Sequence, residues 1–193
     1  MANQIDERCN WCLGDSLYES YHDNEWGVPL HDDQQLFEFL ILEGAQAGLS
    51  WITVLRKREN YREAFHGFDP EKIARFGKRE KARLLGNEGI IRNRLKIDSA
   101  INNAQRYLEL QSRTTFDEYV WQFVEGETIQ NRFKSLSEVP ATTPESDLMA
   151  KTLKKQGFNF VGSTICYAFM QATGMVNDHL VGCPEHKKCL ALG

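Results

Sequence analysis

The feature that most constrains the fold is the apolar run LFEFLILEG at positions 36–44. Apolar residues occupy nearly every side of a helix drawn through this run, and Asp32 or Asp33, a few positions before it, can cap the helix. We therefore expect a buried, central helix from near Gln35 to near Gly44. Glu43 shares a face of this helix with Leu36 and Leu40, so it points into the protein interior. An unpaired carboxylate there is unfavourable.

The sequence pattern predicts helices in the rest of the chain as well, and it shows no internal repeat and no series of alternating hairpins. Apolar residues recur at helical spacing, and capping residues or glycines separate the segments. We expect further helices near positions 51–65, 70–77, 79–85, 97–111, 116–124, 145–156 and 163–173. The segment FNFVG is expected to be extended, and the C-terminal PEHKKCLALG to be loose. The prediction is an all-α fold with one shared core.

Length and composition are those of one ordinary globular domain. The chain has 193 residues, of which 41% are hydrophobic and 26% charged. It contains no apolar run of about 18 residues, so no membrane span is expected. No secretion signal is visible, and we expect a cytoplasmic protein. The formal net charge of -4 argues only mildly against nucleic acid, because a sum says nothing about its distribution.

Cysteine and histidine cluster near the two chain ends. The candidates are Cys9, Cys12 and His22 at one end, and His179, Cys183, His186 and Cys189 at the other. Neither end alone has the repeated spacing of a zinc finger. Two hypotheses stay open: thiols that bind no metal, or one tetrahedral zinc held by a Cys/His pair from each end. The second site would be closed, and therefore structural.

Three short basic clusters lie near positions 56–62, 78–83 and 92–96. Each could be an ordinary solvated helix face. The third follows the turn GNEG, between two predicted helices, where backbone N–H groups and a helix N-terminus can face a phosphate. Helix–hairpin–helix elements hold a DNA backbone in this way without reading its sequence. Aromatic residues in NWC, YHDNEWG and LSW could stack on a base, or simply pack in the core.

Several long motifs together resemble the bacterial 3-methyladenine DNA glycosylase I family. They are ERCNWC, YHDNEWGVPLHD, LEGAQAGLSWITVLRKRENYREAFHGFDP, GIIRNRLKI and KKQGFNFVGSTICYAFMQATGMVNDHLVGC. They run in the family's order from about Glu7 to Cys183. The resemblance implies the all-α helix–hairpin–helix DNA glycosylase fold, in one domain over residues 1–193. It also implies a structural zinc that joins the two chain ends.

The resemblance also implies roles for individual residues. The zinc ligands would be Cys9, His22, His179 and Cys183. Glu43 would contact the base, Tyr21 and Trp51 would stack on it, and Trp11 and Tyr18 would be further pocket aromatics. The hairpin, within about 79–111, would contact the DNA backbone through Gly89, Arg92 and Arg94.

The implied activity is hydrolysis of the N-glycosidic bond of 3-methyladenine in alkylated double-stranded DNA. The enzyme would be a monomer, would flip the base out of the duplex, and would have no lyase activity. No residue is identified that activates the water; Asp178 is a weak candidate, and could instead orient His179.

Three alternatives remain open. Glu43 could be paired with a nearby arginine. The protein could be a binding module that grips nucleic acid without cleaving it. It could also be a glycosylase/lyase for oxidised bases, which requires a nucleophilic lysine, and Lys96 is the nearest one to the hairpin.

Overall fold

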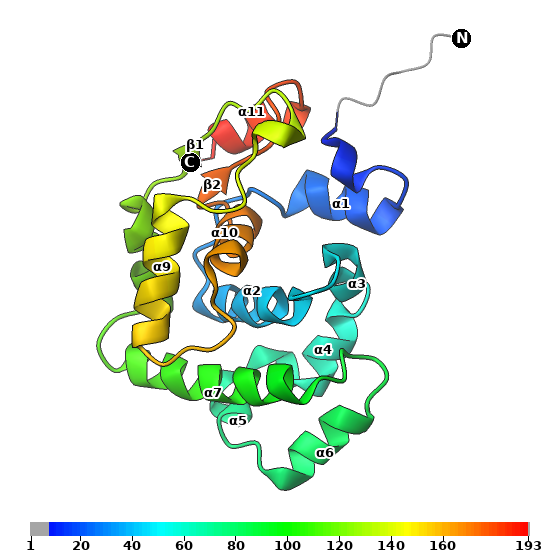
Figure 1. The fold of residues 1–193 in the computed structure, drawn as a ribbon, viewed down its shortest axis with the longest axis vertical. Coiled ribbons are helices and arrows are strands. Elements are labelled where there is room, and N and C mark those ends of the chain that lie inside the picture. The colour runs from blue at the N-terminus through cyan, green and yellow to red at the C-terminus, as the bar shows by residue number, and fades with distance from the viewer. Residues whose placement is uncertain (1–7, 193) are drawn as a thin grey trace.

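The computed structural model describes residues 8–192, and this part of the chain is mostly helical (Figure 1). The first half holds α1 (Ser16–Asn24), α2 (Asp33–Gln46), α3 (Trp51–Leu55), α4 (Arg58–Ala64), α5 (Pro70–Ile73), α6 (Lys78–Gly86) and α7 (Arg94–Gln111). The second half holds α8 (Phe116–Trp121), β1 (Ile129–Gln130), α9 (Pro144–Lys155), α10 (Ser163–Ala172), β2 (Val176–Asn177) and α11 (Pro184–Leu190). Short 3₁₀ turns complete the path, including Asn10–Cys12.

The helix predicted from the apolar run is α2, and it is the centre of the fold. Every residue from Leu36 to Ala45 is buried. The carboxylate of Asp32 accepts a hydrogen bond from the backbone N–H of Gln35 at 2.8 Å and so caps the helix. Helices α3, α7, α8 and α10 pack around α2 (Figure 1). The prediction of a buried central helix is confirmed, and Glu43 lies on it.

Several details of the predicted fold are wrong. The helix predicted over 70–77 ends at Ile73, and the segment FNFVG forms no strand and has Phe160 at a positive φ of 54°. Residues Ile129–Gln130 and Val176–Asn177 form a parallel pair of two-residue strands, which are too short to show alternation. The C-terminal segment, expected to be loose, forms α11, because Pro184 starts the helix and His186 and Cys189 are buried. The predicted helix from 51 to 65 breaks into α3 and α4.

The two ends of the described chain lie on the same side of the molecule. Helix α1, the short strand pair and α11 lie together above α2 and α10 in Figure 1. Helices α6 and α7, with the loop between them, lie at the opposite end. None of the helices in the described part of the chain combines the length and apolar character that a membrane crossing requires.

Candidate active site and metal centre

A cavity of about 210 Å³ lies between α1, the end of α2 and α10. Its aromatic lining is Trp11, Tyr18, Tyr21, Trp26 and Trp51. The structure thus brings together all four aromatic residues that the resemblance assigned to a base pocket. The rings of Tyr21 and Trp51 lie 5.5 Å apart with an interplanar angle of 46°. Burial raises the pKa of Tyr18 to about 12, so this phenol is neutral and can donate a hydrogen bond.

Glu43 lines the same cavity from the last turns of α2. The residue is only 3% exposed, and among residues 8–192 its Oε2 atom has no hydrogen-bond partner. Burial raises the pKa of the Glu43 carboxyl to about 8. The cavity therefore holds an acid that is uncommitted to any partner in the described chain.

The arginines near Glu43 are engaged with other acids. Arg58 makes two hydrogen bonds to Glu25, at 2.5 and 2.8 Å, and its side chain is only 12% exposed. Arg62 pairs with Glu38 at 2.8 Å. The alternative that Glu43 is a salt-bridged structural acid is therefore wrong for the described residues.

Four further polar or aromatic residues line the cavity: Trp26, Gln46, Gln171 and Asp178. Of these, the sequence analysis named only Asp178, as a weak candidate for activating the water. The carboxylate of Asp178 accepts hydrogen bonds from Asn131 Nδ2 at 2.7 Å, Tyr167 Oη at 2.6 Å and Gln171 Nε2 at 2.8 Å. It therefore does not orient His179, contrary to one expectation. Trp26 lies in YHDNEWG and Gln46 follows Glu43 by three positions in α2, so the sequence held a local signal for both. Gln171 and Asp178 come from segments that meet the rest of the cavity only in the fold.

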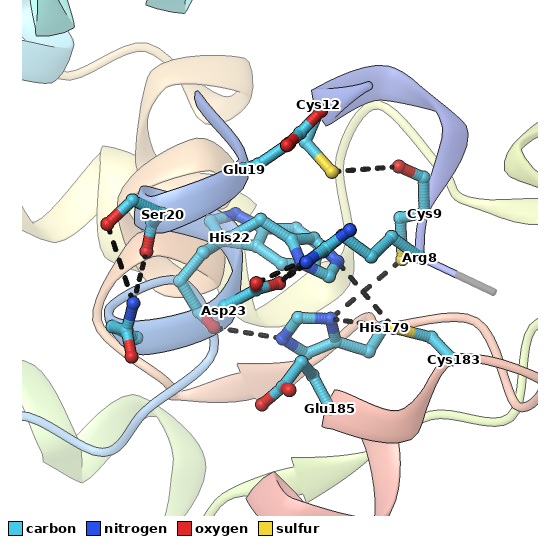
Figure 2. Close-up of polar contacts among 12 residues, drawn as sticks. Arg8, Cys9, Cys12, Glu19, Ser20, His22, Asp23, His179, Cys183 and Glu185 are labelled. Atoms are coloured by element: carbon cyan, nitrogen blue, oxygen red, sulfur yellow. Dashed lines mark hydrogen bonds and ion pairs between the residues drawn. The ribbon is translucent and has the colours of Figure 1, made fainter. Parts of the chain in front are cut away.

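A second cluster joins the chain ends: Cys9, His22, His179 and Cys183 (Figure 2). All four are buried, and their ligand atoms lie within 4.8 Å of one another. This is the ligand set that the resemblance implied, and such a group could hold a metal ion. Cys12, His186 and Cys189 are not part of it. Cys12 donates to the Cys9 carbonyl, and His186 donates to the Asn131 carbonyl.

Both histidines of the cluster are oriented as metal ligands usually are. His179 Nε2 lies 2.9 Å from the Trp26 carbonyl, which can only accept, so this nitrogen carries the proton and Nδ1 faces the thiols. His22 Nδ1 lies 2.8 Å from the Asp23 carboxylate, and its Nε2 faces Cys183 Sγ at 3.6 Å (Figure 2). In each ring the nitrogen that faces the cluster therefore has a free lone pair.

The two thiols complete a donor set that suits a tetrahedral cation. The pKa of Cys183 is held well below its usual range, chiefly by a hydrogen bond from Cys9. The backbone N–H of Leu180 donates to Cys9 Sγ at 3.4 Å. Two sulfurs and two imidazole nitrogens in a buried, closed group fit a structural metal site.

The predicted hairpin lies between α6 and α7. A side chain at Gly89 would bring its Cβ to 3.0 Å from the Cβ and Cγ atoms of Asn60. Gly89 is therefore required by a close approach to α4. Its own N–H already donates to Asn87 Oδ1 at 2.8 Å. The side chains of Arg92 and Arg94 are 51% and 83% exposed, and among residues 8–192 each has only a loose ion pair, at 3.3 and 3.7 Å.

Lys96 is not placed as the sequence suggested. Its Nζ atom donates to the carbonyl oxygens of Ala45 at 2.8 Å and Ala47 at 2.7 Å, at the C-terminal end of α2. The ammonium group thus satisfies carbonyls that the helix end leaves without partners. Lys96 therefore links the start of α7 to the turn beside Glu43.

Comparison with known proteins agrees with this geometry. A family model described as methyladenine glycosylase matches residues 11–186. DNA-3-methyladenine glycosylase 1 of Escherichia coli (strain K12) is 55% identical over 178 residues, which cover 92% of this chain and 95% of that protein. A crystal structure of 3-methyladenine DNA glycosylase I aligns with a TM-score of 0.90 at 56% identity, over 92% of this chain and 98% of that one. Another, in complex with 3-methyladenine, aligns with a TM-score of 0.89 at 35% identity, over 93% and 97%.

Proposed function

The chain is an enzyme that belongs to the methyladenine glycosylase family, and we propose that it hydrolyses the N-glycosidic bond of 3-methyladenine in alkylated DNA during base excision repair. One observation carries the proposal: an aromatic cavity that contains a buried carboxyl group without a hydrogen-bond partner for Oε2 among the described residues. A module that only grips phosphates has no use for such an acid.

The chemistry of the lesion matches the cavity. Methylation at N3 makes the adenine of the nucleotide cationic and weakens its bond to deoxyribose, and the base then leaves as a neutral molecule. The enzyme therefore needs little acid catalysis at the leaving group. The faces of Trp51 and Tyr21 attract a cationic ring, and an ionised Glu43 attracts it more strongly and can accept from its amino group.

The base must leave the duplex to enter this cavity. The cavity lies inside the protein beside α2, where Trp51 is only 8% exposed and Tyr21 only 2%. A base stacked in a duplex cannot reach such walls, which supports a mechanism that flips the nucleotide out of the helix. The loss of stacking and pairing in the duplex would be offset by stacking on the aromatic walls.

We propose that the metal of the terminal cluster is a single structural zinc ion held by Cys9, His22, His179 and Cys183. The support is the Cys₂His₂ donor set and the imidazole orientation fixed by Asp23 and the Trp26 carbonyl. When bound, the ion would tie α1 to the segment before α11. Its stabilising effect reaches the base cavity because Tyr21 precedes the ligand His22.

We further propose that the hairpin binds the DNA backbone through Gly89, Arg92 and Arg94. Exposed guanidinium groups with loose partners can be released to phosphates, and their contacts are independent of sequence.

One hydrophobic cluster that extends from Tyr21 to Val176 supports a single domain. The monomeric state and the cytoplasmic location stay predictions from the sequence.

The proposed reaction is hydrolysis without strand cleavage. A lyase needs a lysine amine free to attack the sugar, and the Lys96 amine is committed to two carbonyl oxygens of α2. The glycosylase/lyase alternative is therefore disfavoured for the only lysine that the sequence offered near the hairpin.

The test is incubation of the purified protein with methylated DNA, followed by chromatography of the released bases. We expect release of 3-methyladenine. Glu43→Gln keeps size and removes charge, and the loss of a charge-assisted hydrogen bond of roughly 1.5–3 kcal/mol predicts a ten- to hundred-fold slower release. Trp51→Ala should also slow release, through lost stacking. Wild-type release by Glu43→Gln would show that Glu43 does not act on the base.

A further inference from the structure

Lys96 makes two hydrogen bonds that tie α7 to the end of α2. Its Nζ atom lies 2.8 Å from the carbonyl oxygen of Ala45 and 2.7 Å from that of Ala47. Within the described part of the chain, no backbone N–H donates to either oxygen, so the ammonium group supplies their hydrogen bonds. Two charge-assisted bonds from one ammonium group hold both carbonyls in place.

The charge of Lys96 acts on α2 rather than on its own helix. Lys96 is the third residue of α7, and a cation in the first turn of a helix faces the positive end of the helix dipole. Its side chain instead reaches the negative end of α2, where a cation is favourable. Burial lowers the pKa of the Lys96 amine, because part of its hydration is lost. The two carbonyl oxygens replace that hydration.

The turn that Lys96 holds connects two walls of the base cavity. Glu43 lies near the end of α2, and Trp51 is the first residue of α3. The connection between them contains Gly48, at a positive φ of 79°. Gly48 and Leu49 are both exposed, so packing restrains them little. The position of the Trp51 ring relative to the Glu43 carboxyl therefore depends on the groups that fix this turn.

We propose that Lys96 is a positioning residue for release of the base: its two hydrogen bonds fix the turn between α2 and α3, and so hold Trp51 and Glu43 at the spacing that one flat base requires. This inference rests on the proposed function. Lys96 acts through the backbone of Ala45 and Ala47 and touches neither the base nor the sugar. A displacement of about 1 Å in a group that positions a substrate can slow a reaction by roughly a hundredfold.

The test compares the wild type with two variants of Lys96 and one control. Lys96→Met keeps an unbranched apolar side chain and removes the ammonium group. Lys96→Arg keeps a cation whose several N–H groups can donate to both carbonyls. The matched control is Lys151→Met, which removes the same charge from an exposed position on α9. If Lys96→Met does not fold, Lys96→Gln, which keeps one amide donor, takes its place.

The first measurement is release of 3-methyladenine from methylated DNA in a single turnover with excess protein. We expect Lys96→Met to release the base roughly ten- to hundredfold more slowly than the wild type and Lys151→Met. Lys96→Arg should recover most of the rate. Affinity for an undamaged duplex should be the same in Lys96→Met and Lys151→Met, because the Lys96 amine is occupied by carbonyl oxygens rather than phosphates.

The second measurement is amide hydrogen exchange, which needs no DNA. Exchange in the turn at positions 44–50 should become faster in Lys96→Met than in the wild type, while exchange in α10 stays unchanged. Such a local change distinguishes the loss of positioning from a general loss of stability, which would accelerate exchange throughout the protein.

Four results would each overturn the proposal. They are release by Lys96→Met at the wild-type rate, release by Lys96→Arg as slow as that of Lys96→Met, unchanged exchange in the turn, and faster exchange throughout the protein. Weaker binding of Lys96→Met to the undamaged duplex, with an unchanged release rate, would make Lys96 a phosphate contact instead. Failure of the proposed function is distinct, because the wild type would then release no 3-methyladenine, whereas the exchange measurement would still show whether Lys96 holds the turn.

Discussion

The raised pKa of Glu43 predicts a measurable dependence of stability on pH. The ordinary value for a glutamate is 4.5, and in the folded protein burial raises the pKa of Glu43 to about 8. The folded state therefore binds this proton more tightly than the unfolded state does. The favourable contribution of the protonated acid is complete below pH 4.5 and is lost progressively as the pH rises toward 8. A glutamine side chain has no such proton to lose, so the stability of Glu43→Gln should not fall in this way as the pH rises.

The size of the effect follows from the pKa difference. Each pH unit between the two pKa values changes the free energy of unfolding by about 1.4 kcal/mol. The stability of Glu43→Gln relative to the wild type should therefore rise by about 3 kcal/mol between pH 5 and pH 7. The absolute difference at one pH also contains the burial of the amide, so the change with pH is the informative quantity.

Urea denaturation of both proteins at pH 5 and pH 7, at fixed metal content, measures this change. Glu63→Gln is the matched control, because Glu63 is exposed on α4 and its removal should leave the pH dependence close to that of the wild type. Equal stability differences between Glu43→Gln and the wild type at the two pH values would refute the reasoning. The carboxyl would then be well solvated, or paired with a group outside residues 8–192.

Three further predictions concern the metal, the hairpin and the lysine. Metal analysis should find about one zinc per chain, and Cys9→Ser should lower thermal stability far more than Cys189→Ser, since the metal contributes to folding; full zinc occupancy in Cys9→Ser would contradict the ligand set. Gly89→Arg and Arg92→Ala should weaken binding to all duplexes alike and flatten the salt dependence of binding, which titrations at several salt concentrations would reveal. Borohydride should trap no covalent adduct with DNA, whereas an adduct that disappears in a Lys96 variant would restore the lyase mechanism.

Local sequence signals predicted the elements that are determined by local chemistry. The 3.6-residue periodicity and the cap Asp32 were sufficient to predict α2. Thr143 followed by Pro144 is typical of a helix start, and α9 begins there. Thr143 Oγ1 accepts from the Ser146 N–H, and Ser146 Oγ accepts from the Thr143 N–H. A helix of seven residues such as α11 gives little periodic signal. It is stable because His186 and Cys189 are buried and the helix packs against β2, which only the fold brings near.

The composition of the cavity could be predicted only in part for the same reason. Glu43 and Trp51 are close in the chain, so an acid beside an aromatic ring was visible as a local pattern. Asp178 and Gln171 reach the cavity from near α10, more than 120 positions later, and their side chains bond to each other. Lys96 looked like part of a basic patch, but its length lets it cross to the end of α2. A long side chain can reach a partner far from its own sequence neighbours, so those neighbours do not predict which group it contacts.

The same desolvation links the stability and the proposed activity of Glu43. With a pKa of about 8, the acid is mostly protonated in the empty cavity near neutral pH. A neutral base gains little from a protonated carboxyl beyond an ordinary hydrogen bond. A base that carries a permanent positive charge favours the ionised form, so its arrival releases the proton and creates the attraction at that moment. The buried acid is unfavourable in the free protein, and that free energy is recovered only when a cation enters. In the proposed function, this would favour the cationic 3-methyladenine nucleotide over the neutral adenine of undamaged DNA.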